Sequence, residues 1–327
     1  MTTQSSTLTD RRIFVTGAHG FLGKNVVAEL LSRGAACTTP TRLNCDLLNP
    51  RDVDRDIQAA RPDAVIHLAA RVGGIGANRA HPGSFFYENM QMGMNVLESC
   101  RRCSVQKVVL VGTVCAYPKY APVPFREADL WNGYPEETNA PYGIAKKALL
   151  VMLQGYREEY GLKGIYLLPV NLFGPGDSLN LETNHVIPAL IRRFIVAQRA
   201  GFRVVKLWGS GTASREFLFV RDAAKGICDA LERYNDPEPC NLGTGRELSI
   251  MALAGMIADL AGFTGAIEFD HTSPDGQPRR CLDTSRALAK FGWKATTSLE
   301  DGLAETVQWM RSVLPASDII IDPSSSL

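Results

Sequence analysis

The chain has 327 residues, of which 45% are hydrophobic and 21% are charged, and its formal net charge is +1. These values are ordinary for a globular enzyme, and the near-neutral charge gives no reason to expect nucleic acid or an acidic membrane as a partner. No apolar run approaches the roughly 20 residues of a membrane span, and the polar first ten residues lack the apolar core of a signal peptide. We therefore expect a cytoplasmic protein with no nucleic-acid or membrane partner.

Strands and helices alternate through the first half of the chain. Each predicted strand is a short, nearly continuous apolar run, which is typical of a parallel sheet that helices cover on both faces. In chain order we expect strands at 13–15, 35–38, 63–68, 107–111 and 164–170, and helices at 25–33, 51–60, 89–102 and 142–160. The pattern predicts an α/β fold with a doubly wound parallel (Rossmann) sheet.

After Asn171 the pattern loosens into a mixture of helices and isolated strands. We expect helices at 186–200, 221–234, 248–261, 284–291 and 299–312, and strands at 204–207 and 266–269. This mixture predicts a smaller C-terminal α/β lobe interleaved with the end of the sheet. The expected division is a dinucleotide-binding domain at 12–175 to which 216–242 return, a substrate lobe at 176–215 and 243–312, and flexible tails at 1–10 and 315–327.

The eight cysteines are scattered through a chain that is too large to need disulfide bonds. Cys100 and Cys103 have C-x-x-C spacing, but no second pair and no nearby histidine pair completes a zinc site. We interpret them as ordinary thiols on a helix and expect no metal.

A glycine-rich turn follows the first strand and opens the first helix. Its sequence, Thr16-Gly17-Ala18-His19-Gly20-Phe21-Leu22-Gly23, has the spacing G-x-x-G-x-x-G. Gly17 permits the tight turn, Gly20 lets backbone approach a pyrophosphate, and Gly23 lets the helix pack on the strand, while the helix N-terminus offers N–H groups to the phosphates. The context predicts a dinucleotide site rather than a merely structural turn.

The second strand should select the form of the dinucleotide. An acidic residue at its end would bind the ribose of NAD, but the segment 37–42 contains none and carries Arg42 instead. A guanidinium suits the 2′-phosphate of NADP, although Arg42 could equally be a solvated loop charge. We favour NADP over NAD, and we place Asp46 at the adenine edge.

Tyr142 and Lys146 lie four residues apart on a predicted helix, so they share one face. Beside a nicotinamide, the ammonium would lower the pKa of the phenol, which could then exchange a proton with a carbinol or ketone. Thr113 ends a predicted strand at the carboxyl edge of the sheet, where it could donate to a substrate carbonyl beside Tyr142. The three residues together predict an oxidoreductase site.

With these residues assembled, the chain resembles the extended short-chain dehydrogenases/reductases and, within them, the GDP-L-fucose synthase family, which are GDP-4-keto-6-deoxy-mannose 3,5-epimerase/4-reductases. The resemblance runs from about Arg12 to Arg311. Its specific stretches are Ala70-Arg71-Val72-Gly73-Gly74-Ile75-Gly76-Ala77-Asn78, Val114-Cys115-Ala116-Tyr117-Pro118-Lys119, Asn184-His185-Val186-Ile187-Pro188-Ala189-Leu190, Trp208-Gly209-Ser210-Gly211-Thr212 and Arg215-Glu216-Phe217-Leu218. The motifs Cys-x-Tyr-Pro-Lys and Asn-His-Val-Ile-Pro among them are the most specific.

The resemblance implies catalytic roles. Tyr142, Lys146 and Thr113 would serve the reduction, and Cys115 and His185 would be the acid/base pair of the epimerisation. The chemistry agrees, because a 4-keto group acidifies the hydrogens on C3 and C5, and a thiol and an imidazole both titrate near neutrality.

The resemblance also implies ligand contacts. NADP(H) would lie against Gly17, His19, Gly20, Phe21, Leu22, Gly23, Arg42, Asp46, Leu68, Ala69, Ala70, Tyr142, Lys146, Pro169, Asn171, Leu172 and His185. The nucleotide-sugar would lie against Asn184, Arg193, Trp208, Arg215, Asp275 and Arg280. The chain departs from the family at Thr113, where serine is expected, at His19, where arginine is expected, at Arg280, where lysine is expected, and in the loop 179–182.

Three alternatives stay open at this point. The first is a GDP-mannose-type epimerase that uses a tightly bound NAD(P) without net reduction, and the second is a 4-reductase of another GDP-sugar such as a heptose. The third is a nucleotide-sensing binding protein, which would have no need for all five catalytic residues. Extended reductases of this type commonly form homodimers through the tyrosine-bearing helix, where Leu149, Leu150, Met152 and Leu153 offer an apolar surface or belong to the ordinary core.

Overall fold

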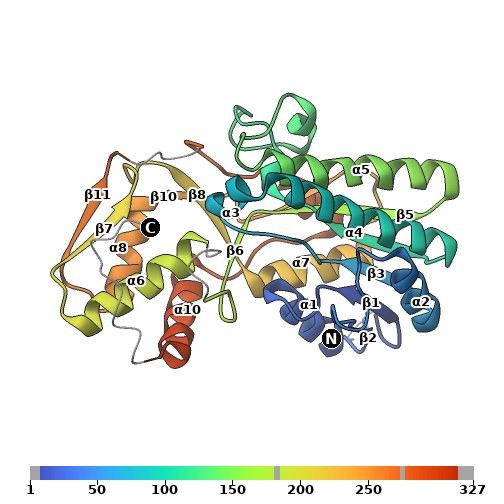
Figure 1. The fold of residues 1–327 in the computed structure, drawn as a ribbon, viewed down its shortest axis with the longest axis horizontal. Coiled ribbons are helices and arrows are strands. Elements are labelled where there is room, and N and C mark those ends of the chain that lie inside the picture. Colours follow the sequence, from blue (N-terminus) through green and yellow to red (C-terminus); the bar gives the residue numbers. More distant parts are fainter. Residues whose placement is uncertain (1–7, 180–184, 273–276, 316–327) are drawn as a thin grey trace.

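The computed structural model describes residues 8–179, 185–272 and 277–315. It consists of a larger part around one parallel sheet and a smaller part beside it (Figure 1). The six strands of the larger sheet have the spatial order β2-β1-β3-β4-β5-β9, and every neighbouring pair is parallel. They are β1 (Arg12–Thr16), β2 (Ala36–Thr38), β3 (Ala64–His67), β4 (Lys107–Val111), β5 (Lys163–Pro169) and β9 (Cys240–Leu242).

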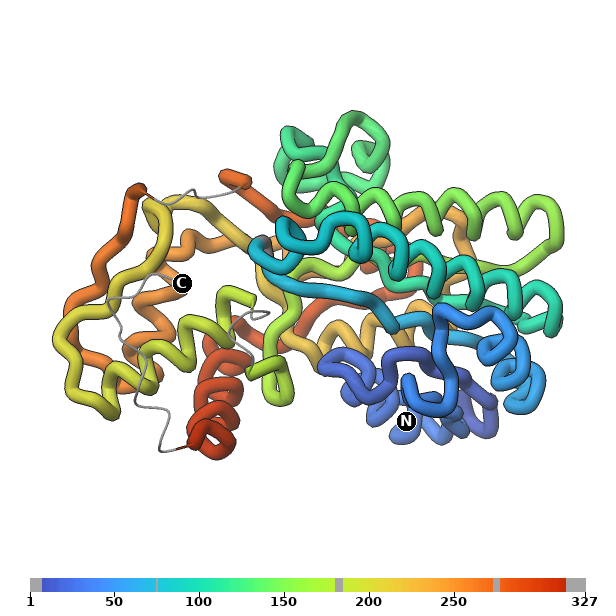
Figure 2. The backbone as a smooth tube through the Cα atoms, in the orientation of Figure 1, coloured from blue at the N-terminus to red at the C-terminus, as the bar shows by residue number. Residues whose placement is uncertain are grey.

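Helices cover both faces of this sheet. On one face α4 (Pro82–Arg102) and α5 (Ala140–Tyr160) lie side by side, with α2 (Pro50–Ala60) next to α4 (Figures 1 and 2). The other face carries α1 (Phe21–Ser32) and α7 (Val220–Arg233), which pack against each other. The predicted doubly wound sheet is therefore confirmed. None of the described helices is long and apolar enough to cross a bilayer.

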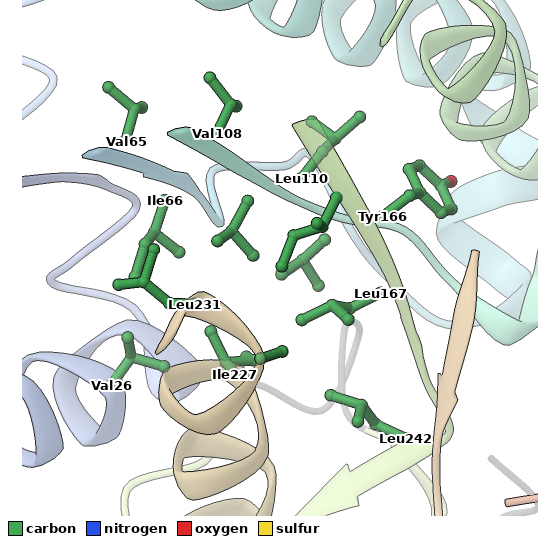
Figure 3. Close-up of a cluster of buried hydrophobic side chains, with 14 of the residues drawn as sticks. Val26, Val65, Ile66, Val108, Leu110, Tyr166, Leu167, Ile227, Leu231 and Leu242 are labelled. Carbon is green, nitrogen blue, oxygen red and sulfur yellow. The ribbon is translucent and has the colours of Figure 1, made fainter. Parts of the chain in front are cut away.

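Apart from the edge strand β2, whose residues are exposed or half-buried, the strands of this sheet are largely buried on both faces, which explains the apolar sequences of β1, β3, β4 and β5. Figure 3 shows Val65 and Ile66, neighbours on β3, pointing to opposite sides of the sheet, with Ile66 directed towards Ile227 and Leu231 of α7. All four side chains belong to one core, and none is more than 5% exposed. This packing holds the carboxyl ends of the strands in a fixed row.

The smaller part has two short sheets and its own core. Its sheets have the orders β10-β8-β6 and β11-β7, and Phe194, Phe217 and Ile257 lie in the core. The strands are β6 (Asn171–Phe173), β7 (Val204–Trp208), β8 (Ser214–Phe219), β10 (Glu247–Ser249) and β11 (Ala266–Asp270). The helices are α6 (Val186–Ala200), α8 (Ile250–Leu260) and α10 (Leu299–Val313).

Several elements differ from the sequence predictions. The strands β6, β8, β9 and β10 were not predicted, and three of them are only three residues long, too short to show a period of their own. The described chain also contains α3 (Ile75–Ala80) and the 3₁₀ turns η1 (Val114–Ala116) and η2 (Glu127–Trp131). Helix α9 (Ser285–Phe291), expected in the smaller lobe, instead contributes Ala287 and Phe291 to the core of the larger part.

Three of the four apolar residues suggested for a dimer surface are buried in the core. Leu149, Leu150 and Leu153 are buried in the core of the single chain, because they face the sheet and α4. The alternative interpretation as ordinary core is therefore correct for these three. On the outward side of α5, Val151 is exposed instead.

Candidate active site

The glycine turn between β1 and α1 is built around close backbone approach. Gly17 has φ +70°, and a Cβ atom on it would lie 2.6 Å from the Ala69 nitrogen. A Cβ on Gly23 would lie 2.0 Å from the Gly17 oxygen, so the helix can start this close to the turn only with glycine there. Gly20 is the N-cap of α1 and has no side chain to cap the helix. The first-turn amides, at Phe21 and Leu22, can therefore serve a diphosphate.

The loop after β3 forms the neighbouring wall. The Leu68 nitrogen donates to the Thr16 oxygen at 3.2 Å, and the Ala69 nitrogen donates to Thr16 Oγ1 at 3.4 Å. These bonds hold Leu68–Ala70 against Gly17. The strands β2 and β3 lie on opposite sides of β1, so the strand order reverses at this point of the sheet. Ligands of doubly wound folds bind at such a switch point, so the residues fit a dinucleotide.

The segment after β2 approaches the same turn. His19 Nε2 lies 3.2 Å from the Thr39 oxygen, which joins the glycine turn to the loop that carries Arg42. Arg42 is exposed there, and Asp46 Oδ1 accepts a hydrogen bond from the Leu48 nitrogen at 3.1 Å. On the other side of the site, Pro169 ends β5. The Asn171 amide in β6 donates to the Glu216 oxygen at 3.0 Å, and Leu172 follows it half-buried.

Thr113, Tyr142 and Cys115 meet where β4 ends and α5 begins. Thr113 is the N-cap of η1, and its Oγ1 accepts a hydrogen bond from the Cys115 nitrogen at 3.2 Å. Gly143 allows α5 to approach this turn, because a Cβ on it would lie 2.4 Å from the Cys115 oxygen. Burial and the neighbouring Cys115 raise the pKa of Tyr142, while a hydrogen bond with Thr113 opposes the rise. Lys146 is not among the groups that shift the pKa of Tyr142 in the protein alone. The lowering of this pKa that we expected beside a bound nicotinamide stays a prediction.

Lys146 lies one helical turn beyond Tyr142 and is 2% exposed. Its Nζ donates to the Val111 oxygen at 3.0 Å, which fixes the ammonium to the end of β4. Burial lowers the pKa of Lys146 to about 8. A buried ammonium with one backbone partner has donors left for a ligand hydroxyl.

His67, the last residue of β3, lies near Lys146. Its Nδ1 is 2.8 Å from Thr16 Oγ1, and its Nε2 has no hydrogen-bond partner within the described residues. Burial and the charge of Lys146 lower its pKa to about 3, so the imidazole is neutral at physiological pH.

His185 belongs to another element than the other four predicted catalytic residues. It is exposed and forms the N-cap of α6, and within the described part of the chain no hydrogen bond joins it to that group. Its described electrostatic neighbour is Asp177, which is 8% exposed; burial raises the pKa of this carboxyl, and His185 lowers it. Asp177 was missed from the sequence, where its place in Gly174-Pro175-Gly176-Asp177 gave only a turn signal.

Among the predicted substrate residues, Asn184 and Asp275 fall outside the described residues. Trp208, at the end of β7, is 53% exposed, so it is not a core residue. Arg193 donates to the Lys206 oxygen at 2.6 Å and Arg215 to the Ser214 oxygen at 2.7 Å. Burial lowers the pKa of Arg193.

Arg280 has contacts that the sequence did not indicate. Its Nη1 donates to Cys115 Sγ at 3.7 Å, and its Nε and Nη2 donate to Gln277 Oε1 at 3.2 and 3.0 Å. Gln277 was not predicted as a site residue, since a lone glutamine beside prolines gives no signal. Among the residues that the structure describes, no group of three or more histidine, cysteine or acidic side chains could hold a metal ion.

Comparisons with known proteins agree with this geometry. Residues 13–243 match the model of the NAD dependent epimerase/dehydratase family. A GDP-L-fucose synthase of Sinorhizobium fredii is 40% identical over 301 residues, which cover 92% of this chain and 96% of that protein.

Solved structures are similar over nearly the whole chain as well. A GDP-L-fucose synthetase from Naegleria fowleri bound to NADP superposes with a TM-score of 0.83 at 30% identity, covering 93% of this chain and 95% of that one. A GDP-mannoheptose C4 reductase from Campylobacter jejuni with NADP bound has a TM-score of 0.84 at 29% identity, covering 92% and 98%.

Proposed function

Because this chain belongs to the NAD dependent epimerase/dehydratase family, we propose that it is an NADP(H)-dependent epimerase/reductase of a GDP-4-keto-6-deoxy-hexose. It would invert C3 and C5 and reduce the C4 ketone, giving a GDP-L-fucose-type product. The observation that carries this proposal is the meeting of Thr113, Cys115 and Tyr142 at the carboxyl end of β4, with Lys146 one turn away.

For the epimerisation, a proton must leave C3 or C5 and return on the opposite face. Cys115 and His185 are the proposed acid/base pair, because a thiol and an imidazole are both side-chain types that serve as general acids and bases. The hydroxyls of Thr113 and Tyr142, hydrogen-bonded to each other, would hold the developing negative charge on the C4 oxygen.

For the reduction, the bound dinucleotide supplies the hydride that C4 accepts. Tyr142 would give a proton to the C4 oxygen, and Lys146, held by the Val111 carbonyl, would bind the nicotinamide ribose and keep positive charge beside the phenol. The diphosphate would lie on the amides after Gly20 and the adenosine near His19 and Arg42. NADP is favoured over NAD by the two solved neighbours that hold it and by the guanidinium of Arg42.

The GDP end of the substrate would lie on the smaller part of the molecule. Exposed Trp208 offers an aromatic face for the sugar or base, and Arg193 and Arg215 offer guanidinium groups for the diphosphate. Asn184 and Asp275 remain candidates from the sequence.

The test is NADPH oxidation by the purified protein with freshly prepared GDP-4-keto-6-deoxy-mannose, with NADH in parallel and NMR of the product. We expect rapid oxidation of NADPH, slower oxidation of NADH and an L-configured 6-deoxy product. Solvent deuterium entering C3 or C5 without oxidation would instead identify an epimerase without net reduction.

A second candidate is a 4-reductase of a GDP-heptose, which the similarity to the Campylobacter jejuni C4 reductase favours. The same assay with a GDP-4-keto-heptose separates the two. Turnover of the heptose alone would replace the 6-deoxy-hexose as substrate.

We also propose a homodimer in which helices α4 and α5 pack against their copies. Phe86 and Tyr87 on α4 and Val151 on α5 are 40%, 61% and 54% exposed, so the outer surface of this helix pair carries large apolar side chains. Sedimentation of the protein, and of a variant with Val151→Glu, tests this assembly: the variant should be monomeric.

A further inference from the structure

Arg280 is a buried cation. Its side chain belongs to a residue that is 9% exposed, and among the described residues no carboxylate lies within ion-pair distance of it. The guanidinium contacts are the Gln277 amide oxygen and the sulfur of Cys115. A buried charge is costly unless its donors are satisfied, and the sulfur of Cys115 is one of the two acceptors that this guanidinium contacts.

Gln277 holds the guanidinium in one orientation. Its Oε1 accepts from both Nε and Nη2, and its Nε2 donates to the Lys119 oxygen at 2.8 Å. Lys119 lies four residues after Cys115, in the same loop. Through its bond to the Lys119 carbonyl, the Gln277 side chain therefore links Arg280 to the segment that carries the thiol. Because Nε and Nη2 both donate to Gln277, Nη1 is the nitrogen that donates to the sulfur.

The backbone of this arm, residues 277–281, is fixed as well. The Ser214 nitrogen donates to the Pro278 oxygen at 2.9 Å, and the Glu216 nitrogen donates to the Arg280 oxygen at 3.1 Å. The Phe125 nitrogen donates to the Cys281 oxygen at 2.8 Å. The arm thus bridges β8 of the smaller part and the loop before η2, and it carries Arg280 to the thiol from a distant part of the sequence.

We propose that Arg280, oriented by Gln277, is a positioning residue that stabilises the thiolate form of Cys115 and thereby prepares it to accept a proton from the sugar. Arginine stays protonated, so it cannot itself take this proton, but a charge-assisted N–H···S⁻ bond stabilises the anion that can. The inference deepens the proposed function, because it concerns the base that the epimerisation requires. Arg280 and Tyr142 are two groups, one charged and one titratable, that interact with this thiol.

An arginine is better suited than a lysine to this arrangement. Its planar fork makes two bonds to Gln277 and a third to Cys115, whereas an ammonium would be a single charge without this fixed orientation. The variant Arg280→Lys therefore keeps the charge but weakens the orientation, and Arg280→Gln removes the charge.

The test is the rate at which iodoacetamide alkylates Cys115, measured from pH 6 to pH 10 by mass spectrometry of its peptide. Half-buried Cys103 in the same chain serves as the internal reference, and Cys115→Ser identifies the signal. No sugar or cofactor is added. At pH 7 we expect alkylation of Cys115 to be about ten-fold slower in Arg280→Gln, because the thiolate is the reactive form, with Arg280→Lys intermediate and the Cys103 rate unchanged.

Gln277→Ala provides a second variant, which retains the cation but not its anchor. A loss of Cys115 reactivity that is smaller than in Arg280→Gln supports the proposal. If Arg280→Gln fails to fold, a loss of Cys115 reactivity in Gln277→Ala relative to the wild type still tests it. Identical pH profiles for Cys115 in the wild type and in the folded variants would overturn the role of Arg280. Dependence of the thiol on Arg280 in a protein that turns over no GDP-4-keto-6-deoxy-hexose would support this role while it contradicts the proposed substrate.

Discussion

Thr113, Tyr142 and Lys146 come from the larger part of the molecule, where Thr113 caps η1 and the other two lie on α5, whereas His185 is the N-cap of α6 in the smaller part. The first three are joined by bonds to backbone or to each other, and their supports are buried strands and a long helix. His185 is exposed and lies beside Asp177. The proposed reducing group is therefore preorganised within one core, while the proposed epimerising pair needs both parts of the molecule.

Cys115 belongs to the first group by position and to the second by proposed role. Its backbone is fixed by Thr113, but its sulfur contacts an arginine that lies 165 residues later. The comparison predicts that changes to Tyr142 or Lys146 on α5 abolish the reduction. Changes to Cys115 or to the residues that contact it should impair the epimerisation and leave the reduction in place.

The largest effect is expected for Tyr142→Phe. Loss of the proton donor to the C4 oxygen should slow NADPH oxidation by about 10²–10⁴-fold, the usual contribution of a general acid. Tyr156→Phe is the matched control on the same helix, because its hydroxyl contacts Glu98 at 2.8 Å rather than Thr113. Equal losses in the two variants, measured by NADPH absorbance, would contradict a special role for Tyr142.

Cys115→Ser should separate the two proposed reactions, because Cys115 lies beside the reducing group but serves the epimerisation. A hydroxyl is too weak an acid to exchange protons near neutrality, so we expect deuterium incorporation at C3 and C5 to fall about 10²-fold. NADPH oxidation should persist, with NMR revealing a product that keeps the original configuration at these carbons. Cys103→Ser should behave as the wild type, and unchanged deuterium incorporation in Cys115→Ser would exclude the thiol as one of the pair.

Gly143→Ala and Gly155→Ala make a matched pair on α5. A Cβ at Gly143 would collide with the Cys115 oxygen at 2.4 Å, so we expect a loss of about 1–3 kcal/mol of unfolding free energy, together with loss of activity. A Cβ at Gly155 meets nothing within 4 Å, so the same change there should stabilise the helix by about 0.5–1 kcal/mol. Urea unfolding measures both, and a neutral Gly143→Ala would contradict the close packing of α5 on η1.

The smallest effect concerns acid stability and His67. Its pKa in the folded chain is lowered to about 3, so between that value and the ordinary 6.5 the unfolded chain binds a proton that the folded chain does not. Stability should therefore fall as the pH falls below the ordinary pKa of histidine, because the folded chain excludes a proton that the unfolded chain binds. His67→Gln should flatten this slope in urea titrations, whereas the exposed His271→Gln should not.

The sheet and the cofactor turn could be predicted from the sequence because their signals are local. Uninterrupted apolar runs mark buried strands, and Gly17, Gly20 and Gly23 have a spacing that a strand–helix turn requires. The strands β6, β8, β9 and β10 were missed because three of them have only three residues, which carry no period, and because the pairing of all four depends on distant partners. The motif-based resemblance to GDP-L-fucose synthases is confirmed by relatives that are similar over most of the chain.

The sequence by itself determined the parallel sheet, the glycine turn and the shared face of Tyr142 and Lys146, since each follows from residues within a few positions of one another. Only the tertiary structure decided that Leu149, Leu150 and Leu153 lie in the core, that Trp208 is exposed and that Arg280 reaches the sulfur of Cys115. These outcomes depend on how two cores pack together, and the contacts across them join residues that no local period or spacing relates.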